Sequence, residues 1–338
     1  MFPFGGCNAT SFIEVKSLKK YFPVQKSLIA QLFSRTMQYV RAVDGVSFEI
    51  ERSDIFGLVG ESGSGKTTTG RITAGLSGPT EGKVVIDGTE IYLLPRRELR
   101  KFRRKMQFAY QDPLSSLNPK MTIGDAVAEP LRYLSDEPQS TRKHKVIELL
   151  ERVGLSPPDS FYARYPHQLS GGQRQRVVIA RAISIEPEYL VADEPVAMVD
   201  VSVRAQIMDL LLKMQKDLNL TILLITHDLA VAKYMCNKIA VMYLGRIMES
   251  ARTKDLFANP LHPYTQALLQ AVPIPNPREK SEKKLPSGEI PSALNPPAGC
   301  RFHPRCSYVF DRCPIEDPEL LERESGHFVS CHLYFDKK

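Results

Sequence analysis

Two short stretches of this sequence have residue types suited to binding phosphate. The first, GESGSGKT at 60–67, matches the P-loop pattern G-x-x-x-x-G-K-[ST], with an apolar strand before it and a helix after it. Its glycines let backbone N–H groups point at phosphates, and the positive end of the following helix strengthens the attraction. We expect the phosphates to be bound by Gly60, Ser62, Gly63, Ser64, Gly65, Lys66, Thr67 and Thr68.

Within this loop, two side chains have distinct expected roles. Lys66 should reach the β- and γ-phosphates as a mobile positive charge, and the Thr67 hydroxyl should bind Mg²⁺. The second metal contact is expected in YLVADEP, 189–195, where an apolar strand ends in Asp193, placed to hold Mg²⁺ through water. Glu194 follows directly. It is either an exposed loop acid or, as its place beside a P-loop favours, the group that polarises the attacking water.

The second glycine-rich stretch is LSGGQ at 169–173, which opens a helical pattern. Structurally it predicts a helix start, with Ser170 as N-cap and Gln173 as its capping-box partner. The same residues present a hydroxyl and unobstructed N–H groups at the positive end of a helix, so a phosphate-binding role is compatible with capping.

Hydrophobic periodicity predicts the strands and helices that carry these residues. Residues 11–59 alternate like strands, with an irregular stretch at about 23–38, and IFGLVG at 55–60 is a buried strand. Residues from about 112 to 182 are helical, including an amphipathic helix closed by Gly154. Strands and helices then alternate, which predicts an α/β fold with a mostly parallel sheet covered on both faces. The expected later elements are strands at 189–193, 221–226 and 239–245 and helices near 202–218 and 228–236.

Bulk properties restrict the class of protein. The chain has 338 residues, 43% of them apolar, and a net charge of +7. It contains no apolar run of the roughly 18–20 residues that a membrane helix needs, and no N-terminal signal pattern, so we expect a cytosolic protein. The basic run RRELRKFRRK at 96–105 fits a solvated helix face, a nucleic-acid patch or a lipid-facing surface; alone, it favours the first.

Taken together, the P-loop, the Asp193–Glu194 strand and LSGGQ resemble the ATP-binding subunits of ATP-binding-cassette (ABC) transporters, over essentially residues 12–338. The resemblance implies a P-loop ATPase cassette with antiparallel N-terminal strands and a helical subdomain. It also implies that two subunits pack head to tail, each LSGGQ signature closing over ATP held by the other. The residues expected to act in trans are Ser170, Gly171, Gly172, Gln173 and Asp200.

The same resemblance assigns further site residues. Gln111, in FAYQDPL, is similar to the Q-loop glutamine that contacts Mg²⁺ and water, and His227 to the switch histidine that contacts the γ-phosphate. Asp200 resembles the D-loop aspartate, although Ala197 stands where the family usually has Ser. Phe22, or its neighbour Tyr21, resembles the aromatic residue that stacks on adenine.

The C-terminal part resembles the di- and oligopeptide importer branch, through HPYTQALLQAVP at 262–273, a proline-rich linker and PPAGCRFHPRCSYVFDRC. Members of that branch often carry an iron–sulfur cluster. The four cysteines have the spacing C-x5-C-x6-C-x17-C, wider than the pairs of most structural zinc sites, which favours a [4Fe–4S] cluster; Zn²⁺ is the alternative. Disulfides are disfavoured in a reducing compartment. The expected ligands are Cys300, Cys306, Cys313 and Cys331.

The sequence therefore predicts a cassette at 11–255 with a helical subdomain at about 112–182, a helix and linker at 256–297, and an iron–sulfur module at 298–338. The resemblance implies an ATPase that powers a peptide importer from the cytoplasmic face of the membrane. Its partners would be a second, homologous but non-identical ATPase subunit, two permeases and, indirectly, a solute-binding protein, with no nucleic acid. Oligosaccharides or nickel complexes are alternative cargoes, and a soluble ATP-switched iron–sulfur sensor is the alternative function.

Overall fold

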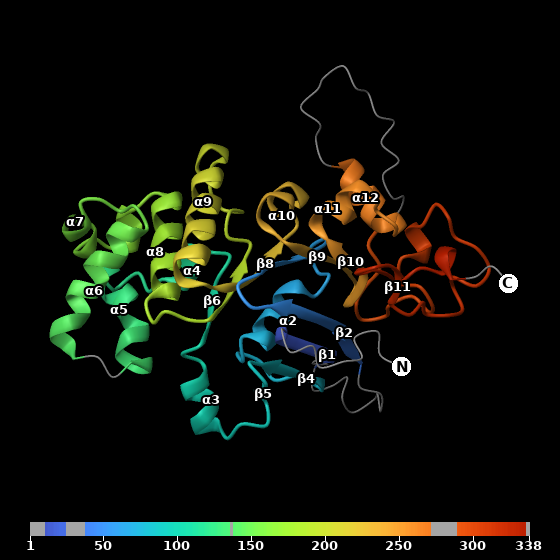
Figure 1. Ribbon diagram of the computed structural model, residues 1–338, viewed down its shortest axis with the longest axis horizontal. Coiled ribbons are helices and arrows are strands. Elements are labelled where there is room, and N and C mark those ends of the chain that lie inside the picture. Colours follow the sequence, from blue (N-terminus) through green and yellow to red (C-terminus); the bar gives the residue numbers. More distant parts are fainter. Residues whose placement is uncertain (1–10, 25–37, 136–137, 272–288, 336–338) are drawn as a thin grey trace, which may run out of the picture.

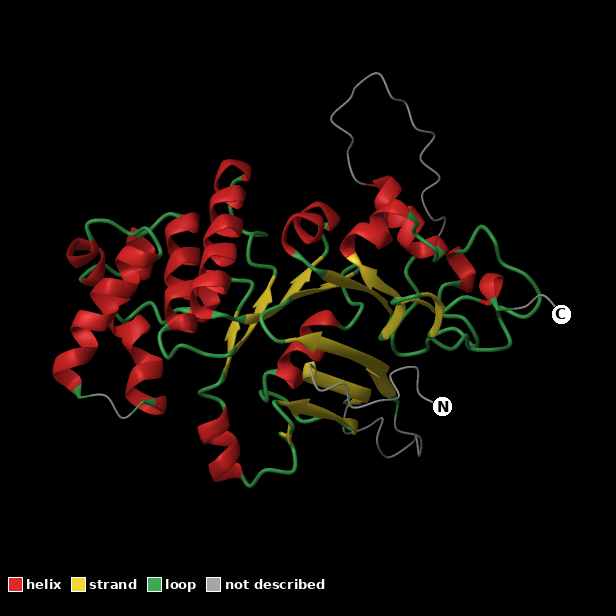
Figure 2. Ribbon diagram, viewed as in Figure 1, coloured by secondary structure: helices red, strands yellow, loops and turns green. Residues whose placement is uncertain are grey.

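A computed structural model describes residues 11–24, 38–135, 138–271 and 289–335. Most of the predicted irregular stretch at 23–38 and of the proline-rich linker lies outside these residues. In the described part of the chain, strands form two sheets and helices flank them (Figures 1 and 2).

The main sheet has the order β11-β12-β10-β9-β3-β8-β7-β6. Neighbours from β6 to β9 pair in parallel, as predicted, and the strands beyond β9 pair antiparallel. Each central strand is a short apolar run buried along its length, because helices or the second sheet cover both faces. The parallel strands are β3 (Ile55–Val59), β6 (Met106–Ala109), β7 (Tyr189–Asp193), β8 (Thr221–Thr226) and β9 (Lys238–Tyr243).

The second sheet is antiparallel and contains the N-terminal strands, as predicted. Its order is β2-β1-β4-β5, and helix α2 (Lys66–Thr73) packs between it and the main sheet, where Ile72 joins a core drawn from both. Phe48 and Phe56 stack across this core with ring centroids 5.0 Å apart. The strands are β1 (Ser11–Pro23), β2 (Tyr39–Glu51), β4 (Glu81–Ile86) and β5 (Thr89–Glu90).

The other face of the main sheet is covered by helices, with a helical subdomain at one side of the molecule (Figure 1). The predicted amphipathic helix is α6 (Gln139–Arg152), and Gly154 closes it with φ 76°, a conformation that favours glycine. The remaining helices here are α4 (Pro113–Ser116), α5 (Ile123–Leu134), α7 (Pro158–Tyr162), η1 (Pro166–Gln168), α8 (Gly171–Ile183), α9 (Val201–Leu218) and α10 (Leu229–Met235).

The four-cysteine segment is joined to the main sheet by strand pairing. β10 (Arg246–Arg252) pairs with β12 (His327–Val329), and β12 with β11 (Leu321–Glu324). Two further helices, α11 (Thr253–Ala258) and α12 (Pro263–Ala271), follow β10 (Figure 1). Short turns of 3₁₀ helix complete the segment at η2 (His303–Arg305) and η3 (His332–Tyr334).

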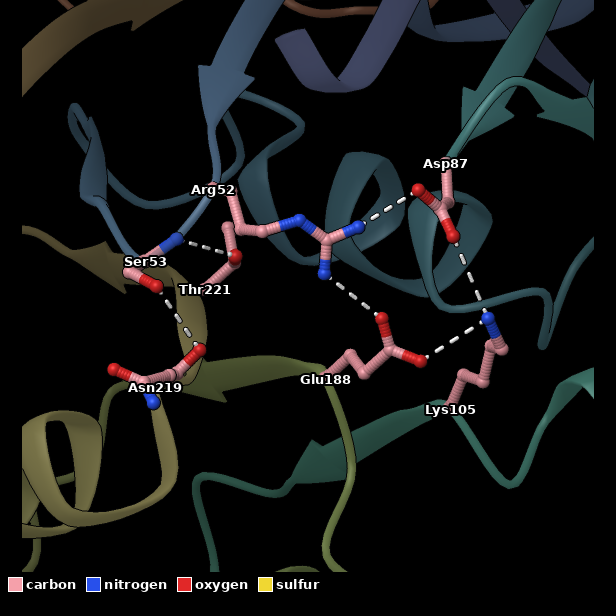
Figure 3. A network of polar contacts seen from close by, with 7 residues as sticks. All are labelled: Arg52, Ser53, Asp87, Lys105, Glu188, Asn219 and Thr221. Atoms are coloured by element: carbon pink, nitrogen blue, oxygen red, sulfur yellow. Dashed lines mark hydrogen bonds and ion pairs between the residues drawn. The ribbon is translucent and has the colours of Figure 1, made fainter. Parts of the chain in front are cut away.

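An ion-pair network joins the two sheets at the edge where the parallel strands begin (Figure 3). Arg52 binds Asp87 at 2.7 Å and Glu188 at 3.0 Å, and Lys105 binds the same two carboxylates at 3.5 and 3.1 Å. These contacts lie at the opposite ends of β6 and β7 from Gln111 and Glu194, and we assign them a purely structural role.

The basic run at 96–105 is largely α3 (Arg96–Phe102), a surface helix without a fully buried residue. This agrees with the reading of the run as a solvated face. Among the described residues, no helix has the length and apolarity that crossing a bilayer requires.

Candidate active site

The predicted phosphate-binding and catalytic residues meet around one open cavity of about 680 Å³. Gln111, Glu194, His227 and the P-loop follow the carboxyl ends of β6, β7, β8 and β3, four adjacent strands of the main sheet. Parallel strands end at the same edge, so residues far apart in the chain converge there. The predicted residues that line the cavity are Gly60, Ser62, Gly63, Gly65, Lys66, Thr67, Thr68, Gln111, Glu194 and His227.

The P-loop depends on glycine where the backbone passes close to other strands. Gly65 has φ 102°, and a Cβ there would lie 2.1 Å from the carbonyl oxygen of Ala42. A Cβ at Gly60 would lie 2.1 Å from the carbonyl oxygen of Met242. Both separations are far below van der Waals contact, so only glycine allows this loop conformation.

Lys66 is buried, and its ammonium group is held by the loop itself. Nζ donates to the carbonyl oxygens of Gly60 at 2.7 Å and Glu61 at 2.8 Å, and to Ser64 Oγ at 3.3 Å. Burial lowers the pKa of Lys66, whereas the nearby negative charges of Glu194, Asp193 and Glu61 raise it. Ser64 lies behind the cavity wall and is absent from its lining, so its predicted contact with phosphate stays a prediction.

Thr67 and Asp193 form the oxygen pair expected at a magnesium site. Thr67 Oγ1 donates to Asp193 Oδ1 at 3.2 Å, and Asp193 is almost fully buried at the end of β7. Burial raises the pKa of the Asp193 carboxyl, and the hydrogen bond from Thr67 lowers it. Hydroxyl and carboxylate oxygens suit Mg²⁺, and the Gln111 amide lies on the same cavity, so these residues fit the metal.

Glu194 and His227 are in direct contact. Nδ1 of His227 lies 2.7 Å from Oε1 of Glu194, whose side chain is 11% exposed. Glu194 has φ 49°, a left-handed conformation that non-glycine residues adopt mainly at turns and functional sites, and its N–H donates to the Ile225 carbonyl at 2.8 Å. The backbone therefore turns sharply after β7 and leaves the carboxylate beside the cavity.

The signature residues lie away from the cavity of their own chain. Ser170 and Gln173 form the predicted capping box, with hydrogen bonds of 3.0 and 3.3 Å. A Cβ at Gly172 would lie 2.6 Å from Val203 Cγ1, so α9 packs closely against this turn. Asp200 is exposed at the start of α9. None of Ser170, Gly171, Gly172, Gln173 and Asp200 lines the described cavity.

The predicted adenine-stacking residues are also absent from the cavity lining. Phe22 is 42% exposed near the end of β1. Tyr21 donates a hydrogen bond to Asp44, and burial together with this bond raises its pKa to about 12. Stacking by either ring stays a prediction for the nucleotide-bound protein.

Sequence reasoning missed part of the cavity wall. Glu61 stands inside the P-loop motif at a position that the motif leaves open. The other missed residues come from β2, from α12 and from the C-terminal end of the predicted 256–297 helix and linker, and tertiary packing that no local pattern indicates brings them to the cavity. These further lining residues are Val40, Ala42, Leu268 and Ala293.

The four C-terminal cysteines gather in one region as free thiols. Burial, together with the charges of the other three cysteines, raises the pKa of Cys300 to about 12. The Tyr308 N–H donates to Cys306 Sγ at 3.4 Å, a bond that favours thiolate sulfur. Within the described part of the chain, no group of three or more His, Cys, Asp or Glu side chains is arranged as a metal site. The structure therefore confirms neither the predicted [4Fe–4S] cluster nor the zinc alternative.

Two family descriptions match the chain. Residues 43–197 match "ABC transporter", and residues 248–313 match "Oligopeptide/dipeptide transporter, C-terminal region". The first spans the P-loop, the signature and the Asp193–Glu194 strand, and the second includes three of the four cysteines.

Similar proteins cover almost the whole chain. The oligopeptide transport ATP-binding protein AppF of Bacillus subtilis is 46% identical over 97% of this chain and 98% of its own length. A putative peptide import ATP-binding protein of Brucella ovis is 45% identical over 95% of this chain and 98% of its own length.

A solved structure of an ATP-binding cassette is also similar to this chain. The ATP-binding cassette MJ0796, described as a dimer in a post-hydrolysis state with ADP and Pi, superposes with a TM-score of 0.62 at 30% identity, covering 71% of this chain and 98% of that one. The chain therefore belongs to the ATP-binding, ATP-hydrolysing subunits of ABC transporters, in the oligopeptide/dipeptide transporter branch.

Proposed function

We propose that this ATPase powers the import of di- and oligopeptides. The observation that carries the proposal is the cavity that gathers Lys66, Glu194 and His227, in a chain whose residues 248–313 match the oligopeptide/dipeptide transporter region. The names of the relatives, which refer to oligopeptide transport and peptide import, support the choice of cargo.

In the proposed mechanism, the P-loop binds the ATP phosphates through its backbone N–H groups and Lys66, which exchanges its bonds to loop carbonyls for phosphate oxygens. Thr67, Asp193 and Gln111 would hold Mg²⁺, which neutralises charge on the phosphates when bound. Glu194 orients and polarises the attacking water, and His227 holds the Glu194 carboxylate and contacts the γ-phosphate.

We further propose that the signature acts across a subunit interface. Ser170–Gln173 and Asp200 are absent from the cavity of their own chain, as a role in trans requires. ATP then favours the closed pair because it contacts both subunits, whereas ADP lacks the phosphate that the signature contacts. A ligand drives a conformational change only through such a difference in affinity.

For the C-terminal segment we propose a [4Fe–4S] cluster on Cys300, Cys306, Cys313 and Cys331. The proximity of the four thiols and the N–H···S bond at Cys306 support it. Iron and acid-labile sulfide analysis of anaerobically purified protein tests this: about four of each per chain are expected. Stoichiometric zinc without iron would favour the alternative.

We propose that the subunit works on the cytoplasmic face of the membrane with a homologous, non-identical ATPase subunit, two permeases and a solute-binding protein. In this proposal residues 11–255 form the cassette, 256–297 the helix and linker, and 298–338 the iron–sulfur module.

The decisive experiment is reconstitution. The chain should be recovered from membranes with hydrophobic permeases, and the assembly in vesicles should take up labelled peptides only with ATP. Uptake of oligosaccharides or nickel complexes in place of peptides would refute the choice of cargo. Recovery without any permease would instead favour a soluble sensor.

A further inference from the structure

The described C-terminal segment, residues 289–335, contacts the P-loop at Glu61. Arg305 donates from Nη1 to Glu61 Oε2 at 2.8 Å and from Nη2 to Oε1 at 3.2 Å, a two-bond arrangement between residues 244 positions apart. The Arg305 side chain is 8% exposed, so water screens the pair weakly. On the backbone side, the Glu61 N–H donates to the Tyr264 hydroxyl on α12 at 3.0 Å. Both the side chain and the peptide of Glu61 are therefore fixed by residues beyond the cassette.

Glu61 in turn makes hydrogen bonds within the phosphate-binding loop. The Glu61 carbonyl accepts a hydrogen bond from Lys66 Nζ at 2.8 Å and another from the Ser64 N–H at 3.2 Å. A rotation of the Glu61 peptide would displace this carbonyl, open the turn at Ser64 and so move the backbone N–H groups of the loop. The position of Arg305 thus sets the geometry of the loop that meets the phosphates.

A second set of contacts braces the same loop from the same segment. Arg301 donates to the Leu244 carbonyl and to Asp44, and the next residue, Gly245, donates its N–H to the Ser64 carbonyl at 2.9 Å. Ala293, which lines the cavity, accepts a hydrogen bond from the Arg41 N–H at 3.1 Å. Arg301 therefore reaches the P-loop indirectly, through Leu244 and Gly245, whereas Arg305 contacts it directly at Glu61.

We propose that Arg305 is a positioning residue for ATP binding: by holding Glu61, it keeps the P-loop in its phosphate-binding geometry and makes nucleotide affinity depend on the C-terminal segment. The inference rests on the ATP-binding role of the cavity. Arg305 itself does not line the cavity, so it acts through Glu61.

Arg305 could affect ATP binding in two ways, and these predict opposite changes in ATP affinity for Glu61→Gln. If Arg305 acted only by neutralising the Glu61 charge near the phosphates, Glu61→Gln would remove a repulsion and tighten ATP binding. If the pair positions the loop, Glu61→Gln must weaken ATP binding even though it removes a negative charge. The sign at Glu61 therefore separates positioning from simple electrostatics.

The experiment measures the Kd of Mg·ATP by isothermal titration calorimetry, and KM and kcat, on the full chain assembled with its partner subunits. Arg305→Gln and Glu61→Gln should each weaken ATP binding about tenfold, with KM rising and kcat little changed. The double variant should bind ATP no more weakly than the single variant with the higher Kd, because both substitutions remove the same interaction. Arg305→Lys, which keeps the charge but loses the two-bond geometry, should fall in between.

The matched control is Arg312→Gln, in the same segment, where Arg312 Nε binds Glu316 at 2.6 Å away from the cavity lining. It should leave the Kd unchanged. An unchanged or tighter Kd in Glu61→Gln, or strictly additive losses in the double variant, overturns the proposal. Should Arg305→Gln fail to fold, Glu61→Gln alone decides by the same criterion. Absence of ATP binding by the unmodified protein would overturn the proposed function together with this inference.

Discussion

Replacing Glu194 by Gln tests the catalytic site with the least disturbance to its structure. Oε1 of Glu194 lies 2.7 Å from Nδ1 of His227, and an amide oxygen can accept the same hydrogen bond from a protonated Nδ1. The substitution therefore keeps volume and contact and removes the negative charge and the ability to take a proton.

The size of the effect follows from what is lost. A positioned general base contributes about 10²–10⁴-fold to a rate, so we expect kcat to fall by that factor. Stability should change by less than about 1 kcal/mol, because the hydrogen bond is retained and a like charge beside Asp193 is removed. ATP affinity should stay equal or increase, since Glu194 no longer repels the triphosphate.

The assay combines steady-state ATPase activity, the Kd of Mg·ATP and the association state of the ATPase subunits with saturating ATP. We expect slow turnover, retained binding and accumulation of the closed pair. Asp209→Asn is the matched control, because Asp209 accepts a 2.7 Å bond from Tyr234 on an exposed surface and should tolerate the change without loss of activity. A kcat within about twofold of the unmodified protein would remove Glu194 from its role as general base. An equal loss of binding and turnover would make it a structural residue.

Three further predictions concern strain, pH and surface charge. Gly65→Ala forces a Cβ to within 2.1 Å of the Ala42 carbonyl at φ 102°, so thermal unfolding should show a loss of at least about 1–3 kcal/mol together with weaker ATP binding. Burial lowers the pKa of His262 to about 4, partly offset by the charge of Glu249, while the unfolded chain titrates near 6.5. The unfolded state then binds more protons between these values, so stability should fall by up to about 3 kcal/mol as pH drops from 6.5 to 4, and His262→Asn should flatten that slope in urea titrations. Glu188→Gln, in the exposed network of Figure 3, should cost at most about 1 kcal/mol, and less at high salt.

The parts of the site that could be predicted are those formed by residues close together in the sequence. Gly65, Lys66 and Thr67 are adjacent in the chain, and the strand 189–193 ends at Asp193 in the structure as in the prediction. The capping box of Ser170 and Gln173 was equally local. In each case, a short pattern determines a backbone conformation that tertiary packing does not override.

What could not be predicted depends on contacts between distant segments. β11 and β12 are too short for alternation to reveal them, so the pairing of β12 with β10 gave no sequence signal. Leu268 on α12 and Ala293 in the predicted helix and linker line the cavity, and no local sequence pattern indicates that either residue contacts the P-loop region.

The contacts of Glu61 explain why a segment outside the cassette belongs to its function. Neither Arg305 nor Tyr264 follows from the P-loop motif, yet together they fix the first residue after Gly60. A cassette without the C-terminal segment would lack the Arg305 guanidinium that pairs with Glu61. The Glu61 carboxylate would then be unpaired beside the phosphates, where its negative charge opposes ATP binding. The proposal therefore implies that ATP affinity falls when the contacts of the C-terminal segment with Glu61 are lost.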